Sequence, residues 1–223
     1  MTLKFAFVVG ALVVALMSYF ICNSRRDWAW LVGGLAFTVG ADFFLVLYDW
    51  HLPGVAIFCF AHVCYISRAL DFKGNEKEKG NKKRRGAWKL FLAVGLAVLI
   101  TSYLGVIWVA GLYAGLFIAN LTINFMVCKR RGFGDSAPIA PIAPIKRKTC
   151  LPKCNRALIL TGLVLFSLCD VNVLLFNLPQ HTNIYMSAWL IQTVFYLIWV
   201  FYLPAQAILA ISAVSFREYN SRL

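Results

Sequence analysis

The sequence predicts an all-α membrane protein, a polytopic bundle of seven transmembrane helices (eight being the alternative), with its N terminus outside and its C terminus in the cytosol. Hydrophobic residues form 61% of the chain and the mean hydropathy is +0.74, whereas about half of an ordinary soluble domain is apolar. Charged residues form only 14% of the chain and gather in short stretches between long apolar runs. These observations exclude a soluble globular domain.

The apolar runs are each long enough to cross about 30 Å of hydrocarbon as a helix, which satisfies its own backbone hydrogen bonds in lipid. The predicted spans are residues 4–22, 28–48, 52–70, 88–104, 107–128, 157–178 and 184–212. An alternative for the first is a cleaved signal peptide, but its apolar run is longer than a usual signal core, and Arg25 and Arg26 follow it as they follow a retained anchor. The last span would reach about 44 Å, so it tilts, extends into the cytosol, or breaks near Pro204 to form an eighth element.

Basic residues predict the orientation of the bundle, because Lys and Arg near span ends favour the cytoplasmic side. Of the 22 Lys and Arg residues, 21 follow spans one, three, five or seven, and only Lys4 lies on the opposite side. We therefore expect one transmembrane domain over residues 1–223, with basic cytosolic loops at 71–87 and 129–156. The net charge of +13 then reflects topology and attraction to anionic membrane lipid. No nucleic-acid partner is expected, because the basic runs lack interleaved aromatic residues.

Asp42 and Asp170 are the only acidic residues predicted inside the spans, and the other seven, including Asp27, are assigned to loops or span edges. A charged side chain in a span costs several kcal/mol, so one that persists usually faces the bundle interior and serves a function. Spans two and six both start in the cytosol, and each aspartate lies 13 or 14 residues in, which predicts a similar depth of about 20 Å. A Gly-Leu pair precedes each aspartate at the same spacing, which hints at a parallel internal duplication.

Polar side chains near the aspartates, or on other spans, complete the candidate site, because positions three or four apart share a helix face. The candidates that would bind or orient the substrate are Thr38, His62, Tyr65, Ser167, Tyr202 and Gln206. Asn120 and Asn124 form a similar pair in span five, which we interpret as interhelical hydrogen bonding rather than catalysis. One His with two Asp makes a poor zinc site, so no metal is expected.

Four motifs connect these residues to a known family. They are the segments 34–42, 60–65, 162–170 and 202–206. In order and spacing they resemble the YhhN family, the lysoplasmalogenase-like transmembrane proteins. The family pattern has Gly-Asp in the first motif and Ser-Asp in the third, where this chain has Ala41-Asp42 and Cys169-Asp170, and Pro204 departs from the fourth. Both acids are kept.

The resemblance implies hydrolysis of the vinyl ether bond of a lysoplasmalogen, which yields a fatty aldehyde and a glycerophospho-ethanolamine or glycerophospho-choline. It implies a lysophospholipid substrate and an endoplasmic reticulum membrane. We expect no cofactor, and the oligomeric state is left open, with a homodimer as one alternative. Two carboxyl groups suit this chemistry, because one can deliver a proton while the other stabilises the oxocarbenium ion and activates water. Asp42 and Asp170 would supply them, with the assignment of the two roles left open.

Two other function classes remain open. One is a proton-coupled carrier of lipids or small molecules, in which the aspartates relay protons. The other is a non-catalytic receptor-like or scaffolding protein, although span seven has no lysine for a retinal Schiff base and the extracellular loops are short. Release of aldehyde from a lysoplasmalogen by the purified protein distinguishes the enzyme from both.

Overall fold

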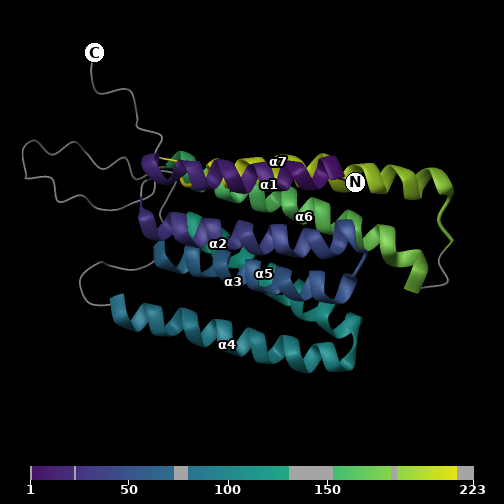
Figure 1. The fold of residues 1–223 in the computed structure, drawn as a ribbon, viewed down its shortest axis with the longest axis horizontal. Helices are drawn as coiled ribbons and strands as arrows, with labels where there is room; N and C mark the ends of the chain where they lie inside the picture. The colour runs from purple at the N-terminus through teal and green to yellow at the C-terminus, as the bar shows by residue number, and fades with distance from the viewer. Residues whose placement is uncertain (1, 23, 73–79, 131–152, 182–184, 215–223) are drawn as a thin grey trace, which may run out of the picture.

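Seven long α-helices lie side by side along the long axis of the molecule in a computed structural model of the chain (Figure 1). The structure describes residues 2–22, 24–72, 80–130, 153–181 and 185–214. The helices are α1 (Thr2–Met17), α2 (Arg25–Asp42), α3 (His51–Phe72), α4 (Gly80–Leu104), α5 (Val106–Arg130), α6 (Lys153–His181) and α7 (Ala188–Ile211). Two short turns follow α1 and α2, the 3₁₀ turn η1 (Ser18–Ile21) and the π turn η2 (Phe43–Leu47).

Each of these helices, with η1 continuing α1 and η2 continuing α2, provides a stretch that is long and apolar enough to cross a membrane. The stretches are Leu3–Ile21, Arg25–Leu47, His51–Asp71, Gly86–Leu104, Ile107–Cys128, Asn155–Asn177 and Ala188–Ile211. Their bounds lie within four residues of the predicted spans, so the prediction of a polytopic helical membrane protein is confirmed. Of the two predicted basic loops, residues 73–79 and 131–152 lie outside the described part of the chain, and α4 already begins within the first.

The last span is one continuous helix rather than two. α7 begins after Ser187, whose hydroxyl accepts a hydrogen bond from the Leu190 N–H at 3.4 Å, and it runs through Pro204 to Ile211. Its 24 residues reach about 36 Å, which removes the excess length that suggested a break. A proline deprives a helix of one hydrogen bond, and the surroundings within a membrane bundle can offset that loss. The described residues therefore contain seven candidate spans and not eight.

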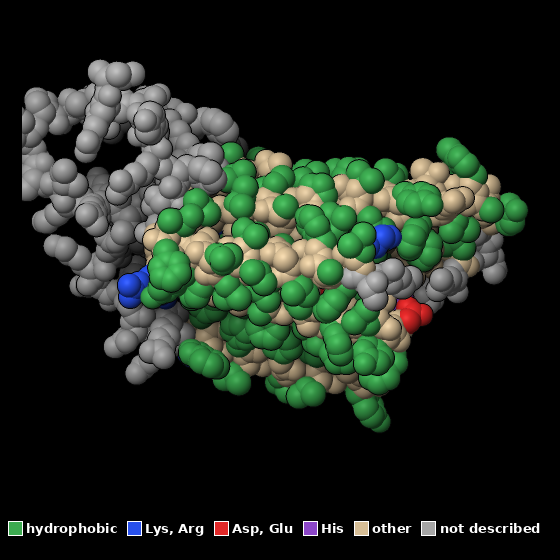
Figure 2. Space-filling view, turned by 45° about the horizontal axis from the view of Figure 1, so that its top comes forward, with side chains coloured by type: hydrophobic (Ala, Val, Ile, Leu, Met, Phe, Trp, Pro, Cys, Tyr) green, Lys and Arg blue, Asp and Glu red, His purple; other side chains and the backbone are tan. Residues whose placement is uncertain are grey.

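Large apolar side chains cover the outside of the bundle (Figure 2). Leu92, Leu99, Ile107 and Trp189 each expose at least 71% of their surface. Soluble monomers rarely expose contiguous apolar patches larger than a few hundred Å². A surface of this kind is suited to lipid, in agreement with an integral, multi-pass membrane protein.

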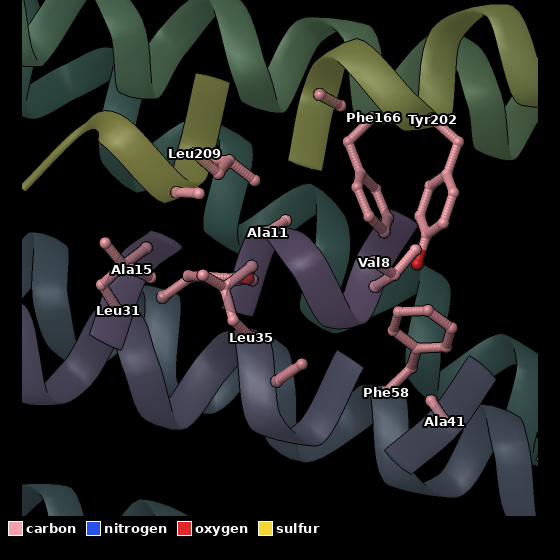
Figure 3. Close-up of a cluster of buried hydrophobic side chains, with 14 of the residues drawn as sticks. Val8, Ala11, Ala15, Leu31, Leu35, Ala41, Phe58, Phe166, Tyr202 and Leu209 are labelled. Atoms are coloured by element: carbon pink, nitrogen blue, oxygen red, sulfur yellow. The ribbon is translucent and has the colours of Figure 1, made fainter. Parts of the chain in front are cut away.

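Helix α1 contributes to the interior of the bundle. Its small residues Val8, Ala11 and Ala15 belong to the same buried cluster as Leu31 and Leu35 of α2 (Figure 3), and α1 also packs against α7. Small side chains allow membrane helices to approach one another closely. The small side chains of α1 therefore allow it to pack closely against α2 and α7.

Glycines of the two Gly-Leu motifs allow two pairs of consecutive helices to pack closely. A Cβ atom at Gly34 would lie 2.6 Å from the ring of Tyr65 on α3. A Cβ atom at Gly162 would lie 2.8 Å from Leu209 on α7. Each glycine thus makes room for a side chain of the next helix, Gly34 in the α2–α3 pair and Gly162 in the α6–α7 pair. This equivalence agrees with the predicted duplication.

A third acidic residue is buried in the bundle, so the prediction that only two acids lie in the interior is wrong. Asp27 lies in the first turn of α2, and Arg68, near the end of the predicted span 52–70, lies within α3. Arg68 donates to both carboxylate oxygens of Asp27, at 2.5 and 3.0 Å, and to the Ser212 hydroxyl at 2.8 Å. Asn155 of α6 donates to the Ser212 carbonyl at 2.8 Å. Because the two charges neutralise each other, they can be buried where a single charge could not.

Candidate active site

Asp42 is the last residue of α2, and the π turn η2 follows it directly. The residue is only 4% exposed, and its Oδ2 accepts a hydrogen bond of 2.5 Å from the hydroxyl of Tyr202 on α7. Turns of π-helix are rare and often occur at functional sites. The structure therefore brings Tyr202, a predicted orienting residue, into direct contact with a predicted catalytic residue.

Asp170 has a matching partner that the sequence analysis missed. Asp170 is half-buried on α6, and its Oδ2 accepts a hydrogen bond of 2.7 Å from the hydroxyl of Tyr113 on α5. One signal was present in the sequence, because Tyr113 precedes Asn120 by two helical turns and so lies on the same face of α5. Each aspartate is thus held by a tyrosine from a different helix, and we call these contacts the two aspartate–tyrosine pairs.

The two aspartates lie at similar distances from one end of their spans. Asp42 precedes Leu47 by five residues, and Asp170 precedes Asn177 by seven, where these apolar stretches end. At the helical rise these separations are about 8 and 11 Å. Both carboxylates therefore lie nearer the predicted outer end than the predicted cytosolic end, in agreement with the similar depth expected from the sequence.

Two phenylalanine rings connect the two aspartate–tyrosine pairs. The ring centroid of Phe166 lies 5.7 Å from that of Tyr202, and the centroid of Phe58 lies 6.0 Å from those of Phe166 and Tyr113. Figure 3 shows Phe58, Phe166 and Tyr202 converging from three helices. The faces of aromatic rings carry negative potential and attract cations. The connection between the two pairs is therefore apolar and aromatic.

His62 lies beside the pair formed by Asp170. Its ring centroid is 5.0 Å from that of Tyr113 and 5.2 Å from that of Phe117. Asn120 of α5 contacts Nδ1 of His62 on α3 at 3.3 Å, and Asn124 donates to Asn120 within α5 at 2.9 Å. With Asn120 donating, the neutral ring carries its proton on Nε2. That nitrogen is buried without a partner among the described residues.

Tyr65 and Gln206 place further polar atoms in the interior. The Tyr65 ring packs on Gly34, and its hydroxyl has no hydrogen-bond partner in the described part of the chain. Gln206 lies one turn after Tyr202, is 0% exposed, and has no partner there for either amide atom. Buried polar atoms usually bond to protein or to ordered water. These atoms therefore mark positions at which water or a polar part of a substrate can bind.

Thr38 and Ser167 form hydrogen bonds with their own helices. The Thr38 hydroxyl donates to the Gly34 carbonyl at 3.0 Å, and the Ser167 hydroxyl donates to the Leu163 carbonyl at 3.0 Å. Such bonds to the preceding turn are common for hydroxyl side chains inside helices. The structure does not join either residue to an aspartate by a hydrogen bond, so their role in orienting the carboxylates stays a prediction.

The site offers proton transfer and electrostatic stabilisation. Two carboxyl groups can act in the same reaction as acid and base when one of them is protonated and the other is ionised. The tyrosines restrict the positions of both carboxyls, and positioned acids and bases contribute about 10²- to 10⁴-fold to a rate. Among the described residues, no group of three or more His, Cys, Asp or Glu side chains is arranged to hold a metal ion.

Comparison with known proteins adds a family assignment. The model of the YhhN family matches residues 2–214, a range that contains all seven helices and both aspartate–tyrosine pairs. No curated protein and no solved structure matches the chain.

Proposed function

The chain belongs to the YhhN family, and from this premise we propose that it is a lysoplasmalogenase-like hydrolase, which cleaves the vinyl ether bond of lysoplasmalogens inside the membrane. One observation carries the proposal: Asp42 and Asp170 each accept a hydrogen bond from a tyrosine, and aromatic rings connect the two pairs. Paired carboxyl groups perform comparable acid–base chemistry on acetals, through a similar cationic transition state.

The reaction begins with a proton and ends with a water molecule. One carboxyl protonates the β carbon, the double-bond electrons form the new C–H bond, and the α carbon becomes part of an oxocarbenium ion. Water attacks that carbon and transfers a proton to the second carboxylate, which gives a hemiacetal. The second carboxyl then returns its proton to the glycerol oxygen as the bond between that oxygen and the hemiacetal carbon breaks. The hemiacetal hydroxyl gives its proton to the first carboxylate, which releases the fatty aldehyde and restores both carboxyl groups. No step of this hydrolysis requires an external oxidant or reductant.

The surrounding residues suit the separate needs of these steps. Tyr113 and Tyr202 fix the carboxyl groups, as a positioned acid and base require. Phe58 and Phe166 connect the two aspartate–tyrosine pairs, and aromatic faces stabilise cations by about 0.5–2 kcal/mol, so these rings would stabilise the oxocarbenium ion. The unpartnered polar atoms of Gln206, with those of His62 and Tyr65, would hold the attacking water or the glycerol hydroxyl.

The proposed substrate is a lysophospholipid with an ethanolamine or choline head group, and the proposed location is the endoplasmic reticulum membrane. Both rest on the family resemblance. An exposed apolar surface lets such a substrate approach from the bilayer, since a single-chain lipid resides there.

The test is release of fatty aldehyde by purified protein in detergent. The wild type should release aldehyde from a lysoplasmalogen, and Asp42→Asn and Asp170→Asn should each lower the rate by at least about 100-fold. The matched control is Asp49→Asn. The Asp49 side chain is exposed and its φ of 56° lies in the left-handed region, a conformation that Asn also adopts readily.

Correct folding of each variant is checked by size-exclusion chromatography and thermal unfolding. If a folded Asp42→Asn or Asp170→Asn protein keeps full activity, the carboxyl group that was replaced does not take part in the mechanism. Proton-coupled uptake into vesicles without aldehyde release would instead support a carrier.

A further inference from the structure

Lys4 is a cation placed apart from the other basic residues of the chain. It is the single Lys or Arg that the charge pattern assigns to the outer side, and it lies in the first turns of α1. In the structure its Nζ lies 4.1 Å from the centroid of the Trp199 ring and 4.6 Å from that of the Phe195 ring, both on α7. The ion pairs found among the described residues involve Arg26, Arg68 and His51 and do not include Lys4.

The lysine lies close to one of the two aspartate–tyrosine pairs. The Trp199 ring beneath it is 5.9 Å from the ring of Tyr202, which donates to Asp42. The neighbouring residue on α1, Phe5, has its ring 6.3 Å from that of Phe43, the residue that follows Asp42. Two independent series of contacts therefore connect the start of α1 to the Asp42 carboxylate.

A lysine near the end of a membrane helix often only extends its ammonium group toward the lipid head groups. Lys4 differs in that two aromatic rings of α7 hold the ammonium group against the bundle. The ring faces stabilise the charge, but an ammonium group has three N–H donors, and an anionic acceptor would complete its bonding. The Trp199 indole N–H is also buried without a partner in the described part of the chain, and it is a second donor in the same place.

We propose that Lys4, seated on Trp199 and Phe195, binds the phosphate group of the lysophospholipid substrate. The inference rests on the proposed function and adds the substrate feature that is recognised. In a lysoplasmalogen the phosphate and the vinyl ether are attached to opposite ends of one glycerol unit. A cation one ring away from Tyr202 therefore holds the phosphate while the vinyl ether lies toward Asp42, and it directs the alkenyl chain into the bundle.

The test measures binding rather than turnover. Purified full-length protein in phospholipid-free detergent is titrated with a saturated 1-O-alkyl lysophospholipid, which cannot be hydrolysed by this chemistry, and with the 1-O-alkylglycerol that lacks the phosphate. The wild type should bind the phosphorylated ligand at least about tenfold more tightly, the size expected of one charge-assisted contact. Lys4→Met keeps an apolar stem over the rings and should reduce this preference to less than about twofold, whereas Lys4→Arg should retain most of it.

Arg25→Met is the matched control. Arg25 also lies over an aromatic ring, that of Tyr19 at 5.4 Å, but it follows span one on the predicted cytosolic side. Its removal should leave the preference for the phosphorylated ligand unchanged. An equal loss in Arg25→Met would show a general effect of charge and would overturn the proposal.

A diacyl phospholipid with the same head group distinguishes substrate phosphate from bilayer phosphate. If it binds with the same dependence on Lys4, the lysine is a bilayer anchor and the proposal is wrong. An unchanged preference in a folded Lys4→Met protein also overturns it. Binding that depends on Lys4 without any aldehyde release would support the phosphate site while refuting the proposed hydrolysis, so the two failures are distinguishable.

Discussion

Tyr202 and Asp42 are 160 positions apart in the chain, yet the tyrosine hydroxyl donates a 2.5 Å hydrogen bond to the aspartate Oδ2. Tyr113 stands in the same relation to Asp170, 57 positions away, at 2.7 Å. The two bonds join α7 to α2 and α5 to α6. A substitution that removes a hydroxyl therefore tests positioning of a carboxyl with little change in volume.

Tyr202→Phe and Tyr113→Phe should each lower the rate of aldehyde release by about 10- to 100-fold. A hydrogen bond to a charged group is worth about 1.5–3 kcal/mol, and each 1.36 kcal/mol is tenfold in rate. If the tyrosines position the carboxyls, the loss should appear in kcat more than in KM. Tyr196→Phe is the control, since Tyr196 is 58% exposed on the same helix as Tyr202. Equal activity in all three variants would contradict a positioning role.

Gln206→Leu should separate function from stability. The amide is fully buried and has no partner among the described residues, so its replacement by a similar apolar side chain should leave the melting temperature unchanged or raise it. If the amide holds water or substrate, aldehyde release should fall by about tenfold or more. Gln192→Leu, at an exposed position of α7, should change neither quantity. A destabilised Gln206→Leu protein with normal activity would point to a structural amide.

Gly34→Ala and Gly162→Ala should destabilise the bundle by about 1–3 kcal/mol, because each added methyl group would meet a side chain of the next helix and force a shift. At Gly34 the displaced side chain is the Tyr65 ring, so activity should fall as well. The control is Gly111→Ala, where nothing lies within 4 Å of the added atom. Thermal unfolding in one detergent compares the three variants, and a melting temperature of Gly34→Ala equal to that of Gly111→Ala would show that the helices yield without cost.

Arg68→Ala should destabilise the protein by about 3–5 kcal/mol, because it leaves the buried Asp27 carboxylate without its partner. The double variant Asp27→Leu/Arg68→Met removes both charges and should recover much of that loss. Arg26→Ala serves as the control, since its ion pair with Asp71 is half exposed and such pairs are worth about 0–1 kcal/mol. A double variant no more stable than Arg68→Ala would show that the two charges do not act as a unit.

The spans and the two central aspartates could be predicted because both follow from local composition. A run of apolar residues must be helical in lipid, and a charge within it is conspicuous at once. The same reliance on local composition assigned Asp27 and Arg68 to the ends of their spans, where charged side chains meet water. Counting charges near the end of a span treats each of them as solvated, and it does not recognise two opposite charges that neutralise each other across helices.

The partners of the aspartates could not be predicted, because they depend on which helices are neighbours. Tyr202 was included because it lies one turn before Gln206 in the last span, whereas Tyr113 has only its position on the face of Asn120 to distinguish it. Thr38 and Ser167 show the converse, since they lie near the aspartates in sequence but donate to their own helices. Spacing along one helix predicts a shared face, but it does not predict where a hydroxyl hydrogen points.

The π turn η2 has a consequence for variation in the chain. Each hydrogen-bonded turn of a π-helix contains one residue more than a turn of an α-helix. Inserting a single residue into an α-helix produces the same irregularity. The irregularity begins at Phe43, immediately after the Asp42 carboxylate. Changes of length between Phe43 and Asp49 can therefore rotate the outer end of the span while the segment that carries the carboxylate keeps its register. Relatives of this chain can be expected to differ in length there before they differ anywhere in α2.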